Sequence, residues 1–415
     1  MKKILFLVAA LSVSSAVHAG GYRVSLQGQK AQGMAHTGVA MAESAESVFF
    51  NPGSMAVQGD DSQFVGSINV LEGTVKYQNA NTGTSAETDN PTGTPLNLYY
   101  STKHSDKLAW GVGVYTPYGN KVKWQDDWAG SHLVNEIELV SVFVQPTISY
   151  RVSDTISIGF GPAFVSGAVE FNRNLSTSLT DENGDRSNVT LKASGVGAYG
   201  FNFGLLAKIN DRTNFGVSYR SKVDLEARGE SATFNNIPAS LQATFSDTDF
   251  DADLVLPAEL TLGVAHQVND RLTLAFDANR TFWEEYEELR IEFDNSVPTS
   301  INPRNYRDSN IFRFGFQYRR NDAWTFRGGI YWDKTPVQDG YFAPETPRND
   351  STNITGGFTY SQNSNLAFDF SFLISSFSQV DNSYDFYVEN GVTTPFEGTY
   401  KSSAFNLGFG MTYTY

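Results

Sequence analysis

The sequence contains no cysteine, few basic residues and no long apolar run beyond its N-terminal segment. The lack of cysteine excludes disulfides, thiolate catalysis and thiolate metal sites. Lys and Arg total 30 against 45 Asp and Glu, a net charge of -15, and this argues against nucleic acid as a partner because phosphate binding needs basic side chains. No later segment approaches the roughly 20 consecutive apolar residues of a membrane-spanning helix. Any membrane role must therefore use strands.

The N-terminal residues have the features of a secretory signal peptide. Two lysines precede the apolar run Ile4–Leu11, and Val17-His18-Ala19 places small residues at the positions that a signal peptidase requires. We therefore expect residues 1–19 to be removed. A membrane anchor is the alternative reading, and the short length of the apolar run disfavours it.

The segment between Gly20 and Asp60 differs from the rest of the chain because it has no regular period. It is rich in small residues and includes the stretches Gln27–Gly38 and Ser47–Met55. Neither stretch shows a period of two, and neither has a helical stripe long enough to stand alone. We predict that residues 20–60 form a plug, or hatch, folded into the mouth of a barrel made by residues 61–415.

The remainder of the chain alternates with a period of two. In Ile311–Arg319 the even positions are aromatic, whereas the odd positions are Arg, Gly or Gln after the first. An aromatic face would form the core of a soluble sandwich, but it would contact lipid in a membrane barrel. The same alternation recurs in residues 140–150, 215–219, 366–372 and 405–415.

The lengths of the connections distinguish a barrel from a sandwich. Short turns such as His104-Ser105-Asp106 alternate with long polar connections such as Asn120–Val134 and Gly229–Phe250. This alternation with an even strand number is typical of bacterial outer-membrane barrels, and a soluble sandwich has no reason to keep it. We therefore predict an all-β chain forming a 14-stranded antiparallel transmembrane barrel in the outer membrane. The fourteen strand candidates begin near Gln63, Pro95, Lys107, Asn135, Thr155, Leu191, Thr213, Asp251, Arg271, Ser309, Ala323, Thr352, Leu366 and Tyr400.

Several motifs occur in an order that carries a family resemblance. They are Gly28, Gly33 and Gly38 ahead of Asn51-Pro52-Gly53, then Tyr219–Val223, Leu256–Leu260, and Trp324–Gly329 followed by Asp333 and Pro336. In this order, across essentially the whole mature chain, the sequence resembles the FadL family of long-chain fatty acid outer-membrane transporters. The resemblance implies a barrel, closed near its periplasmic end by the plug, that moves hydrophobic molecules inward without an energy source of its own.

Two departures from the family pattern are visible. The usual Asn-Pro-Ala is Asn51-Pro52-Gly53 here, a mild change at a turn. After Pro347, where the family has an acidic segment with a basic residue, this chain has Arg348-Asn349-Asp350-Ser351.

Two short motifs are candidate gating elements. Asn51, Pro52 and Gly53 combine a hydrogen-bonding side chain, a fixed φ and freedom to take positive φ, which suits an ordinary turn. The resemblance implies instead that this element rests against the wall and holds the plug shut. Pro117, Tyr118 and Gly119 interrupt the alternating residues 107–116.

Proline cannot donate to a ladder and glycine often marks a bulge, so strand pairing should break at Pro117 to Gly119. The alternative is that the third strand simply ends there. The resemblance implies a kinked strand that leaves a gap in the barrel wall, through which a hydrophobic ligand leaves sideways.

A basic residue is the candidate for binding an acidic head group. If no bulge intervenes, the lumenal face of strand five runs from Thr155 through Phe171 to Arg173, which places an inward cation above an apolar lining. The resemblance places the family's carboxylate-binding arginine at Arg173, with Arg304 as the weaker candidate for its basic partner. The alternative for Arg173 is a solvated loop cation. Leu139 and Phe143 fall on the otherwise polar face of strand four.

The ligand is therefore expected to be a long-chain fatty acid or another hydrophobic small molecule, with outer-membrane lipid and lipopolysaccharide around a monomeric barrel. Uptake of aromatic or aliphatic hydrocarbons is one alternative, because hydrocarbon carriers share the family's plan. A general diffusion porin is the other, although a porin needs an open polar lumen. An enzyme is not expected, because the few histidines are dispersed, and neither a metal nor a cofactor is expected. Loop residues choose the ligand, so the sequence does not identify it.

Overall fold

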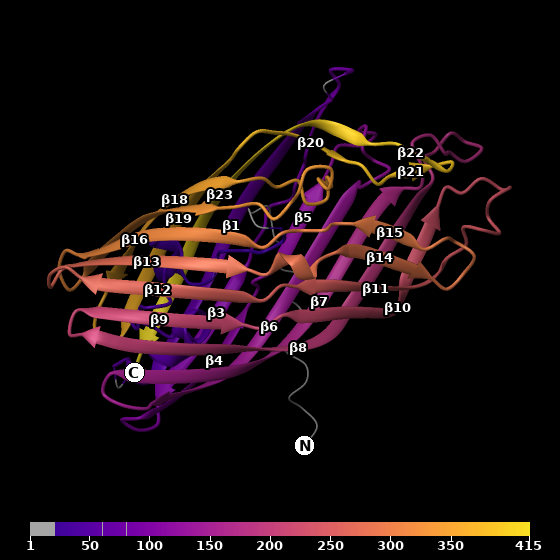
Figure 1. Ribbon diagram of the computed structural model, residues 1–415. Helices are drawn as coiled ribbons and strands as arrows, with labels where there is room; N and C mark the ends of the chain where they lie inside the picture. The colour runs from indigo at the N-terminus through magenta and orange to yellow at the C-terminus, as the bar shows by residue number, and fades with distance from the viewer. Residues whose placement is uncertain (1–20, 60, 80) are drawn as a thin grey trace.

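The structure is a computed structural model that describes residues 21–59, 61–79 and 81–415. The predicted signal peptide at residues 1–19 lies outside the described residues. Strands form a closed 14-stranded antiparallel barrel, which confirms the predicted architecture (Figure 1). The ring closes where the first and last strands pair, from Gln63 opposite Thr414 to Gln78 opposite Thr399.

Several wall strands consist of two successive segments separated by a short interruption. In chain order the wall segments are β1 (Gln63–Gln78), β3 (Leu96–Lys103), β4 (Leu108–Tyr115), β5 (Gly119–Lys123), β6 (Glu136–Arg151), β7 (Ile156–Asn174), β8 (Asn188–Asn210), β9 (Thr213–Arg220), β10 (Val223–Asn235), β11 (Thr248–Leu256), β12 (Glu259–Gln267), β13 (Leu272–Thr281), β16 (Ser309–Arg319), β17 (Trp324–Asp333), β18 (Ser351–Ser361), β19 (Leu366–Phe377) and β23 (Phe396–Thr414).

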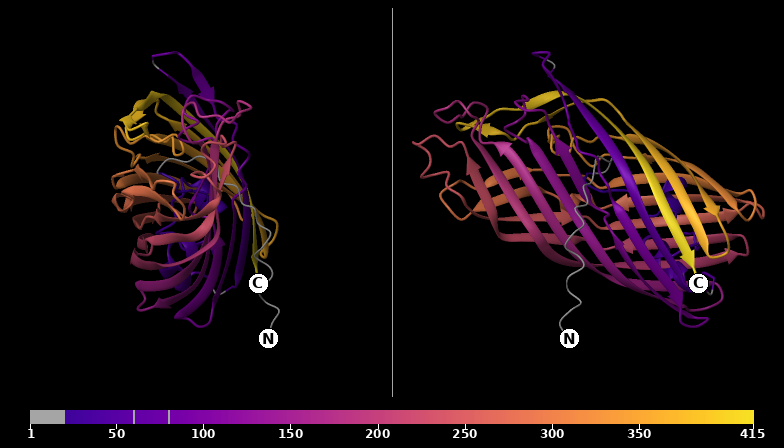
Figure 2. Two further views of the ribbon diagram at one scale, coloured as in Figure 1. Left: turned by 90° about the vertical axis from the view of Figure 1, so that its right-hand side faces the viewer. Right: turned by 180° about the vertical axis from the view of Figure 1, so that it is seen from behind.

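Short strands and helices complete the fold. The strands are tilted, and the smallest ones gather at the end that carries the long connections (Figures 1 and 2). The additional strands are β2 (Ser85–Glu87), β14 (Glu288–Phe293), β15 (Ser300–Pro303), β20 (Val380–Tyr384), β21 (Val388–Glu389) and β22 (Val392–Thr393). The helical elements are α1 (Gln29–Gly33), α2 (Ser47–Phe50) and the 3-10 helices η1 (Pro52–Val57) and η2 (Trp283–Glu285). Within the described residues, no helix has the length and apolar character needed to cross a membrane.

The period-two alternation predicts the two faces of the wall correctly. Along β16 the aromatic side chains Phe312, Phe314 and Phe316 are exposed on the outer surface, whereas Arg313 between them is only 3% exposed. The inward face is polar or small because it meets the plug instead of lipid. The barrel therefore has an apolar exterior and a lumen that is filled by the chain itself.

Two of the predicted long connections are shorter than expected. Residues 229–250 contain the end of β10 at Asn235 and the start of β11 at Thr248, and residues 120–134 begin inside β5. Strand segments beyond the membrane need no apolar outer face. Their sequences are polar on both faces, so an apolar–polar alternation does not identify them as strands. The wall thus extends well above its lipid-facing band.

The described N-terminal residues 21–59, called the plug from here on, lie inside the ring of strands. Helix α1 packs on β17, β18 and β19, and η1 packs on β6, β7 and β8 across the lumen. Most plug side chains are buried, including polar ones such as Gln27, Gln32 and Asn51. The missing period of this segment is explained by these contacts, because the surrounding wall pairs polar groups such as those of Gln27 and Asn51, although the side chain of Gln32 has no hydrogen-bond partner.

Candidate functional site

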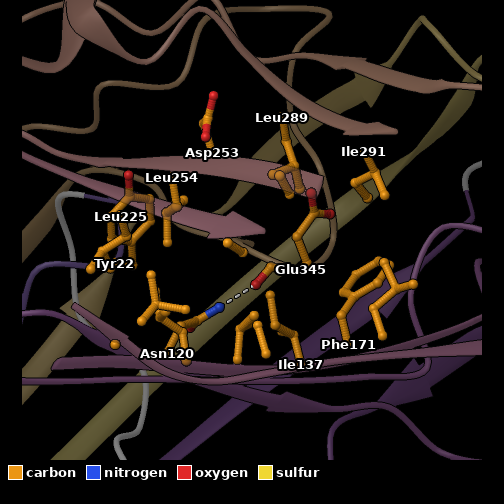
Figure 3. A pocket seen from close by; sticks show the side chains of 18 of the residues that line it. Tyr22, Asn120, Ile137, Phe171, Leu225, Asp253, Leu254, Leu289, Ile291 and Glu345 are labelled. Carbon is orange, nitrogen blue, oxygen red and sulfur yellow. Dashed lines mark hydrogen bonds between the residues drawn. The ribbon is translucent and has the colours of Figure 1, made fainter. Parts of the chain in front are cut away.

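An apolar pocket occupies the lumen between the plug and the long connections. Its empty volume is about 890 Å³, including the open solvent at its mouth. The side chains that define it come from β6, β7, β8, β10, β11 and β14 (Figure 3). They include Ile137, Leu139, Val169, Phe171, Leu191, Leu225, Leu254, Leu289 and Ile291. A pocket of this size and lining suits a hydrophobic small molecule.

A buried ion pair forms the polar end of this pocket. The Arg304 guanidinium contacts the Glu345 carboxylate, and both side chains are almost completely buried. Burial lowers the pKa of Arg304, but Glu345 and the nearby tyrosines outweigh burial and raise it overall. Asn120 Nδ2 donates to the backbone oxygen of Glu345 at 2.6 Å, the bond drawn in Figure 3. Arg304 is therefore already neutralised by a partner.

Arg173 remains on the lumenal face, as the parity of its strand predicts. The only register shift between β7 and β8 puts the extra residue on β8, at Gly195, so the parity of β7 is unchanged. Arg173 donates to Ser300 Oγ at 3.2 Å and has no ion pair within 4.0 Å in the described part of the chain. It lines a smaller cavity that shares Phe171, Leu289 and Arg304 with the apolar pocket. The two cavities therefore adjoin.

The two apolar residues predicted on strand four have different positions. Leu139 lines the apolar pocket, as Phe171 also does. Phe143 is fully buried outside the lining of that pocket, where its ring stacks on Tyr115 with the centroids 5.7 Å apart and lies 6.2 Å from the Tyr118 ring. Phe143 thus supports the wall next to the strand interruption.

The wall is interrupted at Pro117, where the sequence predicts a break. Strand β4 ends at Tyr115 and β5 resumes at Gly119, so the third strand continues beyond the interruption. In the described residues, the ladder to the preceding strand stops at Leu98 opposite Val114 and returns only as an isolated bridge between Thr88 and Trp124. This stretch of the third strand therefore has no continuous ladder to the second strand in the described residues.

The plug supplies the missing partner. Val24 N donates to Pro117 O and Gly119 N donates to Tyr22 O, both at 2.8 Å. Gln27 Nε2 donates to Thr116 O at 2.9 Å. Backbone groups at the interruption are therefore paired with the plug, which avoids the cost of burying them unsatisfied.

This N-terminal segment of the plug, which forms an isolated β-bridge between Arg23 and Tyr118, separates two chambers. Tyr22 lines the apolar pocket and packs edge-on against Trp283, and its burial raises the pKa of its hydroxyl well above the ordinary value. Arg23 instead lines a polar chamber that also includes Pro117. Arg23 approaches Glu259 at 3.6 Å and Asp333 at 3.2 Å.

Asn51, Pro52 and Gly53 lie against a different part of the wall. Asn51 Oδ1 accepts from Gly53 N at 2.9 Å, and its Nδ2 donates to Leu205 O of β8 at 2.9 Å. Pro52 and Gly53 rest on β7 and β8, where Ser157 Oγ donates to Gly53 O at 2.6 Å. The candidate gating element Asn51–Gly53 thus attaches the plug to β7 and β8, whereas residues 22–27 cover the interruption.

Glycines of the wall make room for the plug. In three places two glycines face each other across neighbouring strands, and a side chain at either position would collide with a plug residue or crowd it. We call these six residues the glycine seats: Gly159 opposite Gly204, Gly216 opposite Gly263, and Gly315 opposite Gly329. The plug backbone can approach the sheet closely only because these positions lack Cβ atoms.

Some pocket residues are absent from the sequence-based predictions. Leu225 belongs to the alternation of Val223, Leu225 and Ala227, which identifies an inward face but not a pocket. Glu345 belongs to a connection that enters the lumen, where Trp124 Nε1 donates to Pro344 O at 3.1 Å. No local pattern could have found Glu345, because its contacts come from distant strands.

Comparison with known proteins gives a consistent family. The family described as "Outer membrane protein transport protein (OMPP1/FadL/TodX)" matches residues 10–415. "Outer membrane protein P1" of Haemophilus influenzae is 25% identical over 300 residues, covering 66% of this chain and 64% of that protein. "Long-chain fatty acid transport protein" of Escherichia coli (strain K12) is 21% identical over 407 residues, covering 89% and 91%.

Solved structures share the fold. A Pseudomonas aeruginosa FadL homologue superposes with a TM-score of 0.83 at 19% identity, covering 95% of this chain and 99% of that one. The Pseudomonas putida toluene transporter TodX gives a TM-score of 0.72 at 19% identity, covering 96% and 99%. The chain therefore belongs to the OMPP1/FadL/TodX family of outer-membrane transporters of hydrophobic compounds, and it crosses the bacterial outer membrane as a multi-pass barrel.

Proposed function

We propose that this protein takes up long-chain fatty acids, or closely related hydrophobic acids, by passive binding and lateral release. In this proposal residues 1–19 are a leader that is removed, residues 20–60 act as the plug, and residues 61–415 form a monomeric barrel among outer-membrane lipid and lipopolysaccharide. The ligand enters the apolar pocket from the long-connection end. No catalytic step is involved.

The observation that carries this proposal is the arrangement of Arg173 beside the apolar pocket. Its guanidinium has no carboxylate partner in the described residues, whereas Arg304 already has Glu345. Phe171 and Leu289 line both cavities, so an alkyl tail in the pocket can continue to a carboxylate on Arg173. A guanidinium binds a carboxylate through two parallel hydrogen bonds, which favours this class of head group.

Magnitudes assign different tasks to the tail and the head group. Each buried methylene contributes about 0.8 kcal/mol, so a long tail contributes on the order of 10 kcal/mol before the costs of association. A charged hydrogen bond adds about 1.5 to 3 kcal/mol. The tail should therefore determine affinity, and Arg173 should determine orientation and the preference for acids.

The proposed exit is the interruption at Pro117. Support comes from the missing ladder between the second and third strands and from its replacement by Tyr22–Val24. When those plug residues move, unpaired wall backbone and the apolar pocket would face the same opening. A ligand leaving there would pass into lipid without entering water.

The test compares two arginines on opposite faces of the wall. Arg173→Ala should weaken binding of oleate by about tenfold or more and leave binding of hexadecane almost unchanged. Arg290→Ala is the matched control, because Arg290 lies on β14 between the lining residues Leu289 and Ile291 but is exposed and paired with Glu292. Equal losses for the acid and the hydrocarbon in Arg173→Ala would contradict the assignment.

Uptake of neutral hydrocarbons is the second candidate, and one observation favours it. The only basic side chain lining the apolar pocket is Arg304, within the described residues, and Glu345 neutralises it. Competition between toluene and oleate, measured by titration calorimetry, would support this candidate if toluene bound more tightly. A large steady single-channel conductance in the intact protein would instead favour a general porin.

A further inference from the structure

A polar chamber lies below the N-terminal segment of the plug, on the other side of that segment from the apolar pocket. Its empty volume is about 480 Å³, including open solvent. Both plug and wall line it, and Pro117 at the strand interruption is part of its lining. Its charged lining residues are Arg23, Arg220, Glu259, Asp277 and Arg313.

Arg313 is a buried cation without an ion-pair or hydrogen-bond partner among the described residues. It is 3% exposed, its Nε has no hydrogen-bond partner, and no carboxylate lies within 4.0 Å of its guanidinium among the described residues. Asp277 stands directly opposite it on β13, and Tyr331 stands opposite on β17 with its ring centroid 5.7 Å from the guanidinium carbon. A buried, unpaired charge is costly, so this position needs a compensating group.

The acidic groups around the chamber are already engaged. Glu259 is shared between Arg23 at 3.6 Å and Arg220 at 3.5 Å. Asp277 Oδ2 accepts from the plug amides of Gly38 at 3.0 Å and Val39 at 3.3 Å.

Two further titratable side chains, Asp333 and His36, lie at or next to the chamber. Asp333 pairs with Arg23 but does not line the chamber. The chamber is thus lined by three guanidinium groups and two carboxylates. His36 also lines it, and burial lowers the pKa of His36 well below its ordinary value, so that side chain adds no charge near neutral pH. With Asp333 counted, three guanidinium groups face three carboxylates, but none of these carboxylates lies within 4.0 Å of Arg313, so Arg313 has no counter-charge in direct contact.

We propose that this chamber is a binding site for a singly charged anion, held by Arg313 with help from Arg23 and Arg220. The Nε atoms of all three arginines lack hydrogen-bond partners. The unpartnered Oδ1 of Asp277 would repel a doubly charged ion more strongly than a singly charged one. A carboxylate and a halide share this chemistry. The carboxylate of a transported acid would meet this site next to Pro117, and that source rests on the function proposed above.

The experiment uses bromide as the probe in crystals of the intact protein. We expect an anomalous difference peak within hydrogen-bond distance of the Arg313 guanidinium. Arg313→Gln should remove the peak, because bromide affinity should fall by about tenfold or more. Arg319→Gln should keep it, since Arg319 belongs to the same strand but is exposed at its end. A wild-type chamber that contains only water would overturn the proposal, even if Arg313→Gln does not fold.

A second arm identifies the source of the anion. Crystals grown with dodecanoate at the same bromide concentration should lose the bromide peak and gain elongated density at Arg313 if the transported acid is the natural occupant. If dodecanoate leaves the bromide peak unchanged, the anion site is supported and its natural occupant is a small inorganic ion. Failure of oleate to bind at Arg173 would contradict the proposed function without affecting the bromide result.

Discussion

The apolar pocket is lined by large side chains from six strands, whereas the plug below it rests on glycines that contribute no side chain. The apolar pocket occupies the upper lumen, and side chains such as Leu139 and Leu225 determine its shape. Substituting these side chains does not require the backbone to move. In the lower lumen, which the plug fills, the fit depends on how closely the plug backbone approaches the wall backbone at the glycine seats. The two halves of one barrel should therefore tolerate change very differently.

The difference also concerns polarity. In the upper lumen Arg173 has no ion-pair partner among the described residues, while the plug below makes buried hydrogen bonds, as Asn51 does with Val39 O at 2.6 Å and with Leu205 O at 2.9 Å. Leaving buried polar groups unpaired is unfavourable in free energy. Displacing the plug would therefore break several of these hydrogen bonds at once. We therefore expect the glycine seats to hold the plug in one closed arrangement, and the apolar pocket to accept ligands of different shapes.

The largest effect is expected for a methyl group at a glycine seat. In Gly204→Ala the new Cβ would collide with Asn51 Oδ1 and come within 2.7 Å of Gly53 N. Overpacking of this kind costs about 1 to 3 kcal/mol, and here it can be relieved by releasing the plug. We expect frequent channel openings in planar bilayers and increased entry of bulky antibiotics into cells.

The control for that substitution is on the same strand. Gly197 also belongs to β8, but nothing lies within 4 Å of a Cβ added there. Gly197→Ala should keep the closed state of the wild type. If Gly204→Ala conducts no more than Gly197→Ala, the glycine seats do not hold the plug.

A smaller loosening is expected for Asn51→Ala. The substitution removes the side-chain cap on Gly53 N and the two hydrogen bonds that Asn51 donates, but it introduces no collision. Loss of such a cap costs about 0.5 to 2 kcal/mol. Limited proteolysis should cleave the plug faster than in the wild type, while oleate affinity should change less than twofold. A protected plug would mean that Pro52 and Gly53 suffice as the anchor.

In the upper lumen, Leu139→Ala should weaken ligand binding and leave the plug seated. The side chain is 4% exposed and lines the pocket, so truncation removes contacts with an alkyl tail. Loss of about one or two methylene contacts corresponds to roughly a threefold to tenfold lower affinity for oleate, measured by calorimetry. Increased proteolysis of the plug in this variant would break the comparison between the two halves.

The wall could be predicted from the sequence because lipid imposes one rule on every strand. Phe312, Phe314 and Phe316 can face outward only if Arg313 faces inward, so alternation alone determines both faces. The rule fails above the membrane, where β10 and β11 continue through polar residues. The break in alternation also predicts the interruption at Pro117. It does not identify the plug segment that pairs with this interruption, because Val24 and Pro117 lie far apart in the chain.

The candidate site was predictable in part. Alternation along β7 predicts that Arg173 points inward. Arg173 does line a lumenal cavity, because the bulge at Gly195 lies on the neighbouring strand and leaves the alternation of β7 unchanged. The position of Phe143 could not be distinguished from that of Leu139, because both are apolar on an inward face and only their height in the barrel separates them. Glu345 and Tyr22 enter the pocket through tertiary contacts of irregular segments, which leave no periodic signal.

The smallest expected effect is a dependence of plug seating on pH. Glu46 is 3% exposed in the plug, where it accepts a hydrogen bond from Lys30 N at 3.4 Å, and burial raises the pKa of its carboxyl from 4.5 to about 7. Because the pKa is raised in the seated state, its contribution to seating is complete below about pH 4.5 and is lost as the pH rises through about 7.

Hydrogen exchange at the amides of residues 28–33, corrected for the intrinsic pH dependence of exchange, should therefore be faster at about pH 8 than at about pH 5. Glu46→Gln should abolish this difference, since the amide does not titrate. Glu43→Gln should retain it, because Glu43 is exposed and bonded to Gln317 at the edge of the plug. Among the described plug residues, Tyr22 lines the apolar pocket, and burial raises the pKa of its hydroxyl well above this pH range, so oleate affinity should not follow the exchange rates. Equal corrected rates at both pH values in the wild type would show that Glu46 does not control how firmly the plug is seated.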